Sequence, residues 1–376
     1  TDMSSSSTNA GVLIAPSVTY RIEGSSADQE LKVFDCSTVQ NVFDGVFDLS
    51  DNDALYYRET FFNKEHYNFL ASTQPENPIC VSIVLEQDGK HYSVLIRTSA
   101  GNERMQVPAE TVKASWWRRL FRAGPSPYDM LRSITPQYYN GMRQVVDPAL
   151  PQALLNLEEK QTIKGFKFGI LYAMEGQTKE DEMFANVDSS PEFEEFLDFI
   201  GERVPLTGWT NFRAGLDVRS GTTGTHSIYQ RVNNNEVMYH VSVMLPFNVK
   251  DKQQLERKRH IGNDIVVIVF QDGDTVYRPT TISSRQVHVV LVVKAVRLES
   301  DPGQRYYRLG IVSKETVPEF GPAMPANGLF KKDQAFKDFF YAKLLNAEKA
   351  SYIAPILENK LSRTRKALLK DVTESF

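Results

Sequence analysis

One charged segment, residues 250–264, carries the side chains best suited to chemistry. It reads KDKQQLERKRHIGND and runs directly into the apolar stretch of residues 265–270. Its first part is rich in helix-forming residues. At about 100° per residue, Arg259 and His260 share a face with Asn263 if the helix continues that far. The spacing therefore predicts a cation, an imidazole and a carboxamide on one surface.

The carboxamide of Asn263 is the most informative of these groups. It offers two donor hydrogens and an acceptor oxygen at fixed geometry. Such a group can orient a water and contact a phosphate oxygen at once, as phosphoryl transfer to water requires. Residues 250–260 contain five basic and two acidic side chains, which suits an anionic partner. The alternative is a solvated charged helix that stops at Gly262-Asn263 in a left-handed turn, and the spacing alone leaves both interpretations open.

The composition excludes several other kinds of site. The 376 residues carry 43 Lys plus Arg against 47 Asp plus Glu, a net charge of -4, so no global bias toward nucleic acid exists. Two cysteines exclude a disulfide framework and a multi-cysteine zinc site, and favour an intracellular setting. The six histidines never fall at His-x-x-x-His spacing, and no Gly-x-Ser-x-Gly motif exists. The glycine-rich loop at 213–225 lacks the Gly-Lys-Ser/Thr ending of a phosphate-binding loop, so we expect no bound nucleotide. From the cysteine and histidine spacing, we also expect no bound metal.

The elements that must position Asn263 form a mixed α/β pattern. We expect a flexible tail over residues 1–30, a β-hairpin around Asp88-Gly89, and a helix opened by Ser190-Pro191. Later strands are apolar on both faces, as in a sheet covered by helices on both sides. Trp116 and Trp117 are expected on a short helix that packs its aromatics on the sheet, with a self-association or membrane-surface face as the alternative. No apolar run is long enough to span a bilayer, and no signal-peptide pattern is present.

Residues 253–266 closely resemble the catalytic-helix signature of the Rap GTPase-activating proteins. Further blocks that agree in order are Tyr56-Tyr57-Arg58, Phe166-Lys167-Phe168-Gly169, Gly215-Leu216-Asp217-Val218, His240-Val241-Ser242, Phe320-Gly321-Pro322, Asn346-Ala347-Glu348 and the run from Arg363 to Leu369. Together these blocks cover about residues 55–369. The resemblance implies a two-domain α/β fold: a β-rich dimerisation-type subdomain over 31–155, and a catalytic domain over 156–376 that resembles a G domain and includes the C-terminal helices.

The same resemblance implies roles for individual residues. Asn263 would be supplied in trans to the active site of the GTPase, with His260 holding the helix in place. The residues expected to contact the partner are Arg257, Lys258, Arg259, Arg363 and Gln286. Gln286 stands where the family usually has an aromatic residue, which puts partner preference in question.

The expected function is therefore that of a GTPase activator rather than a stand-alone enzyme. It would have no cofactor of its own and would act on the GTP and Mg²⁺ held by a Rap-family small GTPase. We expect a homodimer, no nucleic-acid partner, no transmembrane segment, and a cytoplasmic location with peripheral recruitment to membranes. The alternatives are a scaffold that binds GTP-loaded GTPases without catalysis, and an activator of Ral or Rheb.

Overall fold

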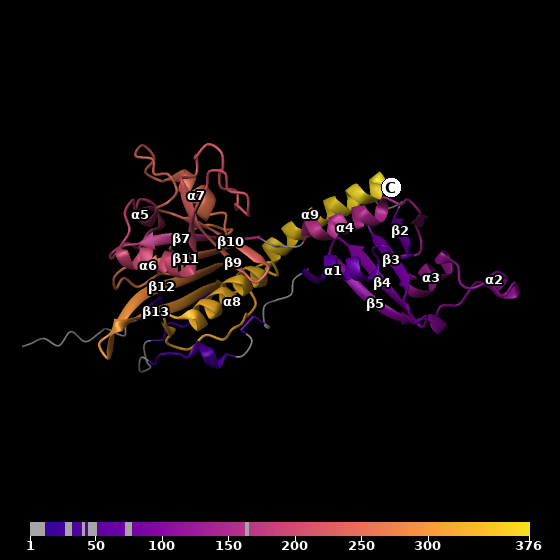
Figure 1. Ribbon diagram of the computed structural model, residues 1–376, viewed down its shortest axis with the longest axis horizontal. Coiled ribbons are helices and arrows are strands. Elements are labelled where there is room, and N and C mark those ends of the chain that lie inside the picture. Colours follow the sequence, from indigo (N-terminus) through magenta and orange to yellow (C-terminus); the bar gives the residue numbers. More distant parts are fainter. Residues whose placement is uncertain (1–11, 27–31, 40–41, 44–50, 72–76, 162–164) are drawn as a thin grey trace, which may run out of the picture. The chain divides into compact units, whose positions relative to one another are not determined.

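The structure is a computed structural model, which describes residues 12–26, 32–39, 42–43, 51–71, 77–161 and 165–376. The chain forms two α/β units (Figure 1). The first consists of residues 1–47 and 164–354, and the second of residues 48–163 and 355–376. The two-part α/β fold expected from the sequence is confirmed, although its boundaries differ.

A mixed sheet forms the centre of the first unit. Its strands are β1 (Tyr20–Glu23), β7 (Gly165–Ala173), β8 (Glu202–Pro205), β9 (His226–Val232), β10 (Asn235–Val241), β11 (Val266–Gln271), β12 (Val289–Leu298), β13 (Asp301–Lys314) and β14 (Leu329–Lys331). The order is β1-β13-β12-β11-β7-β10-β9-β8, with β14 paired to β13. The central strands β10, β7, β11 and β12 run parallel. Because β7 and β11 lie in the middle, both of their faces must be covered.

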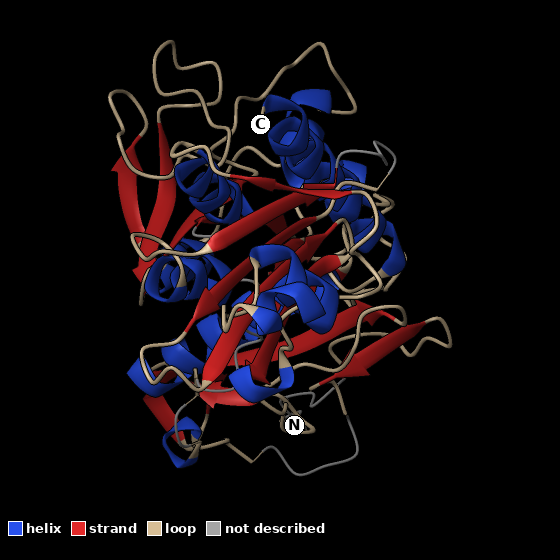
Figure 2. Cartoon of the chain, turned by 90° about the vertical axis from the view of Figure 1, so that its right-hand side faces the viewer, coloured by secondary structure: helices blue, strands red, loops and turns tan. Residues whose placement is uncertain are grey.

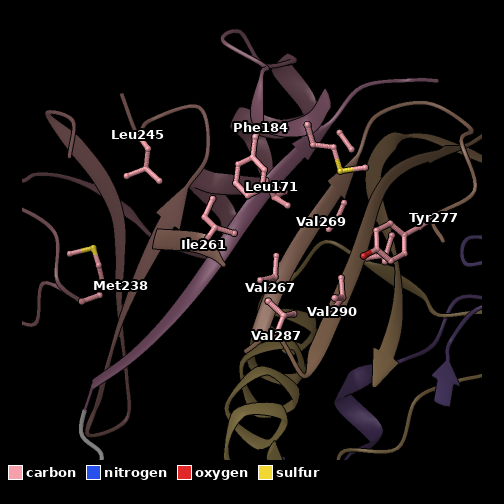
Figure 3. Packing of buried hydrophobic residues seen from close by; sticks show 14 of the residues in the cluster. Leu171, Phe184, Met238, Leu245, Ile261, Val267, Val269, Tyr277, Val287 and Val290 are labelled. Carbon is pink, nitrogen blue, oxygen red and sulfur yellow. The ribbon is translucent and has the colours of Figure 1, made fainter. Parts of the chain in front are cut away.

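Helices supply that cover. They are α5 (Glu180–Phe184), α6 (Pro191–Ile200), α7 (Leu255–Ile261) and α8 (Gln334–Ser351), with a short 3₁₀ turn at Cys36–Thr38. On one face, Phe193 and Phe196 of α6 pack their rings 5.3 and 5.4 Å from that of Phe270, and Phe196 also meets Phe340 of α8. Figure 3 shows the other face, where Val267 and Val269 of β11 lie among the hydrophobic side chains of the α5 and α7 region. Successive residues of β11 thus enter opposite cores, which explains its continuous apolar run.

An antiparallel sheet forms the second unit, in the order β5-β4-β3-β2-β6. The strands are β2 (Tyr67–Ala71), β3 (Cys80–Leu85), β4 (His91–Thr98), β5 (Gly101–Pro108) and β6 (Met142–Val145). The helices are α1 (Asp51–Thr60), α2 (Trp116–Leu120), α3 (Pro127–Ile134), α4 (Leu150–Gln161) and α9 (Pro355–Ser375), with a 3₁₀ turn at Ala109–Thr111. Residues of α1, α4 and α9 share one hydrophobic cluster with the sheet, and α3 packs in another. Strands and helices of the chain are distinguished by colour in Figure 2. The predicted hairpin is confirmed, since β3 pairs antiparallel with β4 around Gly89.

Two predicted boundaries are wrong. The 155/156 boundary falls inside α4, and α9 belongs with the N-terminal sheet because Leu369 and Val372 are buried in the same cluster as Leu157. The predicted tail over 1–30 is wrong for residues 12–26, since β1 pairs with β13 and Ile14 is buried. Gly310 makes room for it, because a Cβ there would lie 2.5 Å from Ile14 Cδ1. Residues 1–11 and 27–30 of that expected tail lie outside the described residues.

The expected packing of the tryptophan pair is also wrong. Trp116 is 63% exposed and Trp117 is 59% exposed, so neither ring is covered by the sheet. Five residues of helix give α2 little more than one turn, and none of them is buried. The exposed rings favour the alternative interpretation of this segment as an interaction face.

Candidate functional site

Helix α7 is fixed at both ends by neighbouring side chains. At its start, the carboxylate of Asp251 accepts hydrogen bonds from the backbone N–H groups of Gln253 (3.0 Å) and Leu255 (2.7 Å). At its end, Ile261 is buried beside Leu171 and Phe184 (Figure 3). Gly169 of β7 permits this close packing, since a Cβ there would lie 2.7 Å from Ile261 Cγ2. The helix therefore presents its last turn, and the loop that follows, at a fixed place above β7.

Asn263 lies in that loop and is exposed. Its Nδ2 donates a hydrogen bond of 2.7 Å to the carbonyl oxygen of Arg259, which caps the end of the helix. Within the described part of the chain, no partner is recorded for its Oδ1. The left-handed turn that belonged to the alternative interpretation does not occur, because Gly262 has a φ of -69° and Asn263 is not among the residues of positive φ. The helix ends at Ile261, so Asn263 follows the helix rather than sharing its face.

A buried ionic network holds the backbone beneath this carboxamide. Lys167 of β7 places its Nζ 3.0 Å from the carbonyl oxygen of Asn263 and 3.0 Å from Oδ1 of Asp264. The other oxygen of Asp264 lies 2.8 Å from Nδ1 of His240, whose Nε2 lies 3.0 Å from the carbonyl oxygen of Ala214. The two ring nitrogens of His240 thus contact the carboxylate of Asp264 on one side and a backbone carbonyl oxygen on the other. We call Lys167, Asp264 and His240 the anchor network.

His260 packs against the anchor network without joining its hydrogen bonds. Its ring centre lies 5.2 Å from that of His240, at 61°, and its Nε2 is buried with no hydrogen-bond partner among the described residues. Burial, with the nearby His240 and Arg259 acting in the same direction, lowers the pKa of His260 to about 4. The ring is consequently neutral at pH 7 and acts here as a packing group.

The basic side chains of α7 are largely neutralised within the chain. Lys258 contacts Asp181 and lies 3.4 Å from Glu180, both on α5. Burial alone lowers the pKa of Lys258, but these two carboxylates outweigh it and the pKa is raised. Arg259 is exposed and pairs with Glu256 at 2.7 Å. The positive surplus counted along the sequence is therefore weaker at the surface.

Arg257 is not at the surface, so its predicted contact with a partner is corrected. The side chain is 1% exposed. Its guanidinium donates to the carbonyl oxygens of Leu245, Pro246, Phe184 and Asn186 at 2.6–3.3 Å. Burial lowers the pKa of Arg257 to about 10. Its role is to tie α7 to two neighbouring loops.

Gln286 is brought near the end of α7. The backbone N–H of Gln286 donates to Ser284 Oγ (3.1 Å), and that hydroxyl donates to the carbonyl oxygen of Gly262 (2.6 Å). A pocket of about 210 Å³ lies here, lined by residues that include Phe184, Lys258, Asn263 and Ser284. Arg363 is an exposed residue of α9 in the second unit.

Sequence reasoning assigned no role to the residues that hold Asn263 from below. Lys167 and His240 lay in the matching blocks, and Asp264 directly follows Asn263, so adjacency was the one available signal. Glu348 and Arg365 were likewise missed. Glu348 is buried on α8 and accepts from the hydroxyl of Tyr352 at 2.9 Å, while Arg365 donates to the carbonyl oxygen of Thr98 at 2.6 Å within the second unit.

The described residues contain no cluster of three or more His, Cys, Asp or Glu side chains arranged to hold a metal ion. Across the same ranges, no helix has both the length and the apolar character needed to cross a membrane.

Comparisons with known proteins point to one group. Residues 183–366 match the family described as Rap/ran-GAP. The chicken GTPase-activating Rap/Ran-GAP domain-like protein 3 is 37% identical over 85% of this chain and 34% of its own length. The RapA guanosine triphosphatase-activating protein 1 of Dictyostelium discoideum is 33% identical over 87% of this chain and 36% of its own. The solved TSC2 GAP domain is 31% identical, covers 52% of this chain and 99% of its own, and has a TM-score of 0.44. The chain spans about a third of the length of these two curated relatives.

Proposed function

Because this chain belongs to the Rap/ran-GAP family, we propose that it stimulates GTP hydrolysis by a Rap-type small GTPase. Two relatives that align with more than four fifths of the chain carry GTPase activation in their names, and one of these names specifies RapA. The partner holds the GTP and Mg²⁺, and this chain contributes side chains to that site.

In this proposal, Asn263 supplies its carboxamide to the active site of the partner. The observation that carries it is the contrast between an exposed side chain and a fixed backbone. Nδ2 is held by the carbonyl oxygen of Arg259, the backbone oxygen is held by Lys167, and Oδ1 has no recorded partner in the described residues. An acceptor held in this way can take a hydrogen bond from the attacking water without reorganising first. That orientation of water against the γ-phosphate is the requirement of phosphoryl transfer to water.

In this proposal, the residues around Asn263 contribute to binding of the partner GTPase and not to the hydrolytic step. The neighbouring pocket of about 210 Å³ can receive a side chain of the partner. Arg259 is exposed and can exchange Glu256 for an anionic group of the partner. Gln286 lies on the loop that is tied to Gly262, so we propose that it contributes to the choice between Rap, Ral and Rheb. The homodimer and the cytoplasmic location that the resemblance implies stay predictions.

Single-turnover hydrolysis of GTP preloaded on Rap, Ral, Rheb or Ras tests the proposal. Asn263→Ala should abolish most of the stimulation and leave the affinity for the GTP-bound partner within a few-fold. A Ras GAP supplies roughly a 10⁵-fold acceleration, about 7 kcal/mol of barrier, which sets the scale on which a single supplied residue acts. The matched control is Asn234→Ala, which removes an exposed carboxamide from the β9–β10 turn.

Three outcomes would contradict the proposal in different ways. Full stimulation by Asn263→Ala would remove the asparagine from the mechanism. Stimulation of Ral or Rheb with none of Rap would overturn the partner. Binding to a GTP-loaded partner without acceleration by the unaltered chain would indicate a non-catalytic scaffold. Thermal unfolding of each variant should also be measured, because the hydrogen bond from Nδ2 to the carbonyl oxygen of Arg259 stabilises the end of α7. An unchanged melting temperature shows that the lost stimulation is a kinetic effect and not a loss of folded protein.

A further inference from the structure

An exposed aromatic cluster in the second unit has no place in the proposed reaction. Its members are Trp116, Trp117 and Leu120 of α2 and the following Phe121, which are 63%, 59%, 67% and 78% exposed. The two indole rings stack with their centres 3.6 Å apart. In Figure 1, α2 lies at the tip of a loop, away from the sheet of its own unit. Single exposed apolar residues are ordinary, but four large ones within six positions mark a surface that contacts something.

The charges around this cluster have a single sign. Residues 111–128 contain Lys113, Arg118, Arg119 and Arg122 and no acidic residue. Among the described residues, none of the three arginines forms a recorded ion pair, and Arg118 donates from Nε to the backbone oxygen of Gly124. The nearest acidic residue along the chain after α2 is Asp129, whose carboxylate is engaged with Ser126 in the capping box of α3. The charge of Arg118 acts on the Asp129 carboxylate, whereas Arg119 and Arg122 have no recorded ion pair among the described residues and remain available to an anionic surface.

We propose that α2 and Phe121 insert into the interface of an anionic phospholipid bilayer, with Arg118, Arg119 and Arg122 contacting the lipid headgroups. Tryptophan favours the depth at which its ring is apolar and its N–H is hydrated. Arginines beside it add attraction to a negatively charged leaflet. The combination of stacked indoles with exposed guanidiniums, of which those of Arg119 and Arg122 have no recorded ion pair among the described residues, favours a bilayer over other occupants.

Two other occupants fit the cluster less well. A second copy of the chain would bring the arginines of both copies together, and like charges that meet at an interface cost free energy. A groove on a partner protein that accepts a helix binds apolar side chains at positions i, i+3 or i+4, and i+7 of that helix. The five residues of α2 do not reach a third anchor. The proposal does not depend on the proposed reaction, and its test uses no GTPase.

Vesicle binding by the full chain, followed by tryptophan fluorescence, tests the inference. The chain has three tryptophans, and Trp209 is partly buried with its indole N–H donating to the carbonyl oxygen of Phe212. A Trp209→Phe background therefore leaves only the signal of Trp116 and Trp117. With phosphatidylcholine vesicles that contain phosphatidylserine, we expect co-sedimentation, a blue-shifted emission, and quenching by lipids brominated near the headgroup.

Variants separate the apolar contribution from the charged one. Trp116→Ala with Trp117→Ala should remove most of the binding, as judged by co-sedimentation. Neutralising Arg118, Arg119 and Arg122 to Gln should weaken it by about fivefold per residue and reduce its sensitivity to salt. Leu85→Ala, which trims an exposed apolar side chain elsewhere in the same unit, should bind as the unaltered chain does.

Several results would overturn the inference. Equal binding to pure phosphatidylcholine would remove the role of the arginines. Unchanged binding after the tryptophan substitutions would remove the role of α2. Absence of vesicle binding, together with light scattering in which the same substitutions convert a dimer to a monomer, would assign the cluster to self-association instead.

Discussion

Replacing Asp264 by Asn tests the anchor network that holds the backbone of Asn263. The substitution keeps the shape of the side chain and removes its charge. Asp264 is 0% exposed, whereas Lys167 is 36% exposed and His240 is 1% exposed. The change therefore removes the buried carboxylate from Lys167, which can partly return to water, and gives buried His240 a neutral partner.

The contacts of Asp264 set the size of the effect. At 3.0 Å, the attraction between Lys167 and Asp264 is about 5–6 kcal/mol with an effective dielectric constant of about 20, before desolvation is subtracted. Removal of one member of a buried pair generally costs about 3–5 kcal/mol. Because Lys167 is partly solvated and the new amide still accepts one hydrogen bond, we expect about 3 kcal/mol. That loss corresponds to a fall in melting temperature of about 6–12 °C for a unit of this size.

The kinetic effect comes from Lys167, which contacts both Asp264 and the carbonyl oxygen of Asn263. When that lysine is loosened, the carboxamide loses part of its fixed position, and a displacement of about 1 Å can cost about 10²-fold in rate. We therefore expect stimulated GTP hydrolysis to fall by about 10- to 100-fold at a temperature where the variant is fully folded. Affinity for the partner should change much less.

Thermal unfolding and single-turnover hydrolysis should be measured for Asp264→Asn, Lys167→Met and the double variant. If the two residues act as a pair, the double variant should be little worse than the worse single one. The control is Asp274→Asn, which removes an aspartate that is 76% exposed from its pair with Lys294 and should cost less than about 1 kcal/mol. Strict additivity, or a loss for Asp264→Asn as small as that of the control, would refute this account of the anchor network.

Two further substitutions probe buried groups of the first unit. Burial raises the pKa of Glu348 from 4.5 to about 8, with the Tyr352 hydroxyl opposing and Asp264 adding to the shift. The folded state thus keeps a proton that the unfolded state releases, so this contribution is fully present below pH 4.5 and is lost as the pH rises to about 8. Urea unfolding should show that the stability falls by an amount on the order of 5 kcal/mol over this pH range, a fall that Glu348→Gln lacks, and parallel pH profiles of the two proteins would exclude this account. Arg257→Lys should lower stability by about 3 kcal/mol, since an ammonium cannot reach all four carbonyl oxygens, whereas Arg259→Lys should cost almost nothing; equal melting temperatures would contradict this.

Local signals in the sequence predicted local structure well. Ser190 accepts from the N–H of Phe193 at 3.3 Å, and Gly201 ends α6, as the capping residues indicated. The Asp88-Gly89 turn correctly predicted the hairpin, whose strands pair antiparallel from Cys80 and Arg97 to Leu85 and Tyr92. In the functional segment, the helical run and the exposed position of Asn263 followed from residues near one another in the chain.

Features that depend on distant residues escaped prediction. Arg257 reads as one more cation in a basic run, but its partners Phe184 and Asn186 are more than seventy positions away. Lys167 precedes its partners Asn263 and Asp264 by 96 and 97 positions. No periodicity in the sequence relates β7 to the end of α7. The burial of Ile14 depends on the absence of a side chain at Gly310. Such contacts depend on which strands are neighbours in the sheet, and the order of the elements along the chain does not predict that arrangement.

The return of α9 to the sheet of the second unit has a consequence for synthesis and for fragment design. Leu369 and Val372 complete a core whose other members lie between Tyr57 and Leu157, so that core cannot close until almost all of residues 1–376 have left the ribosome. During translation, the β2–β6 sheet of the second unit therefore keeps one hydrophobic face uncovered while residues 164–354 of the first unit are synthesised. A fragment cut at residue 354 would keep that face open permanently, and one begun at residue 183 would lack β7, the strand between β10 and β11.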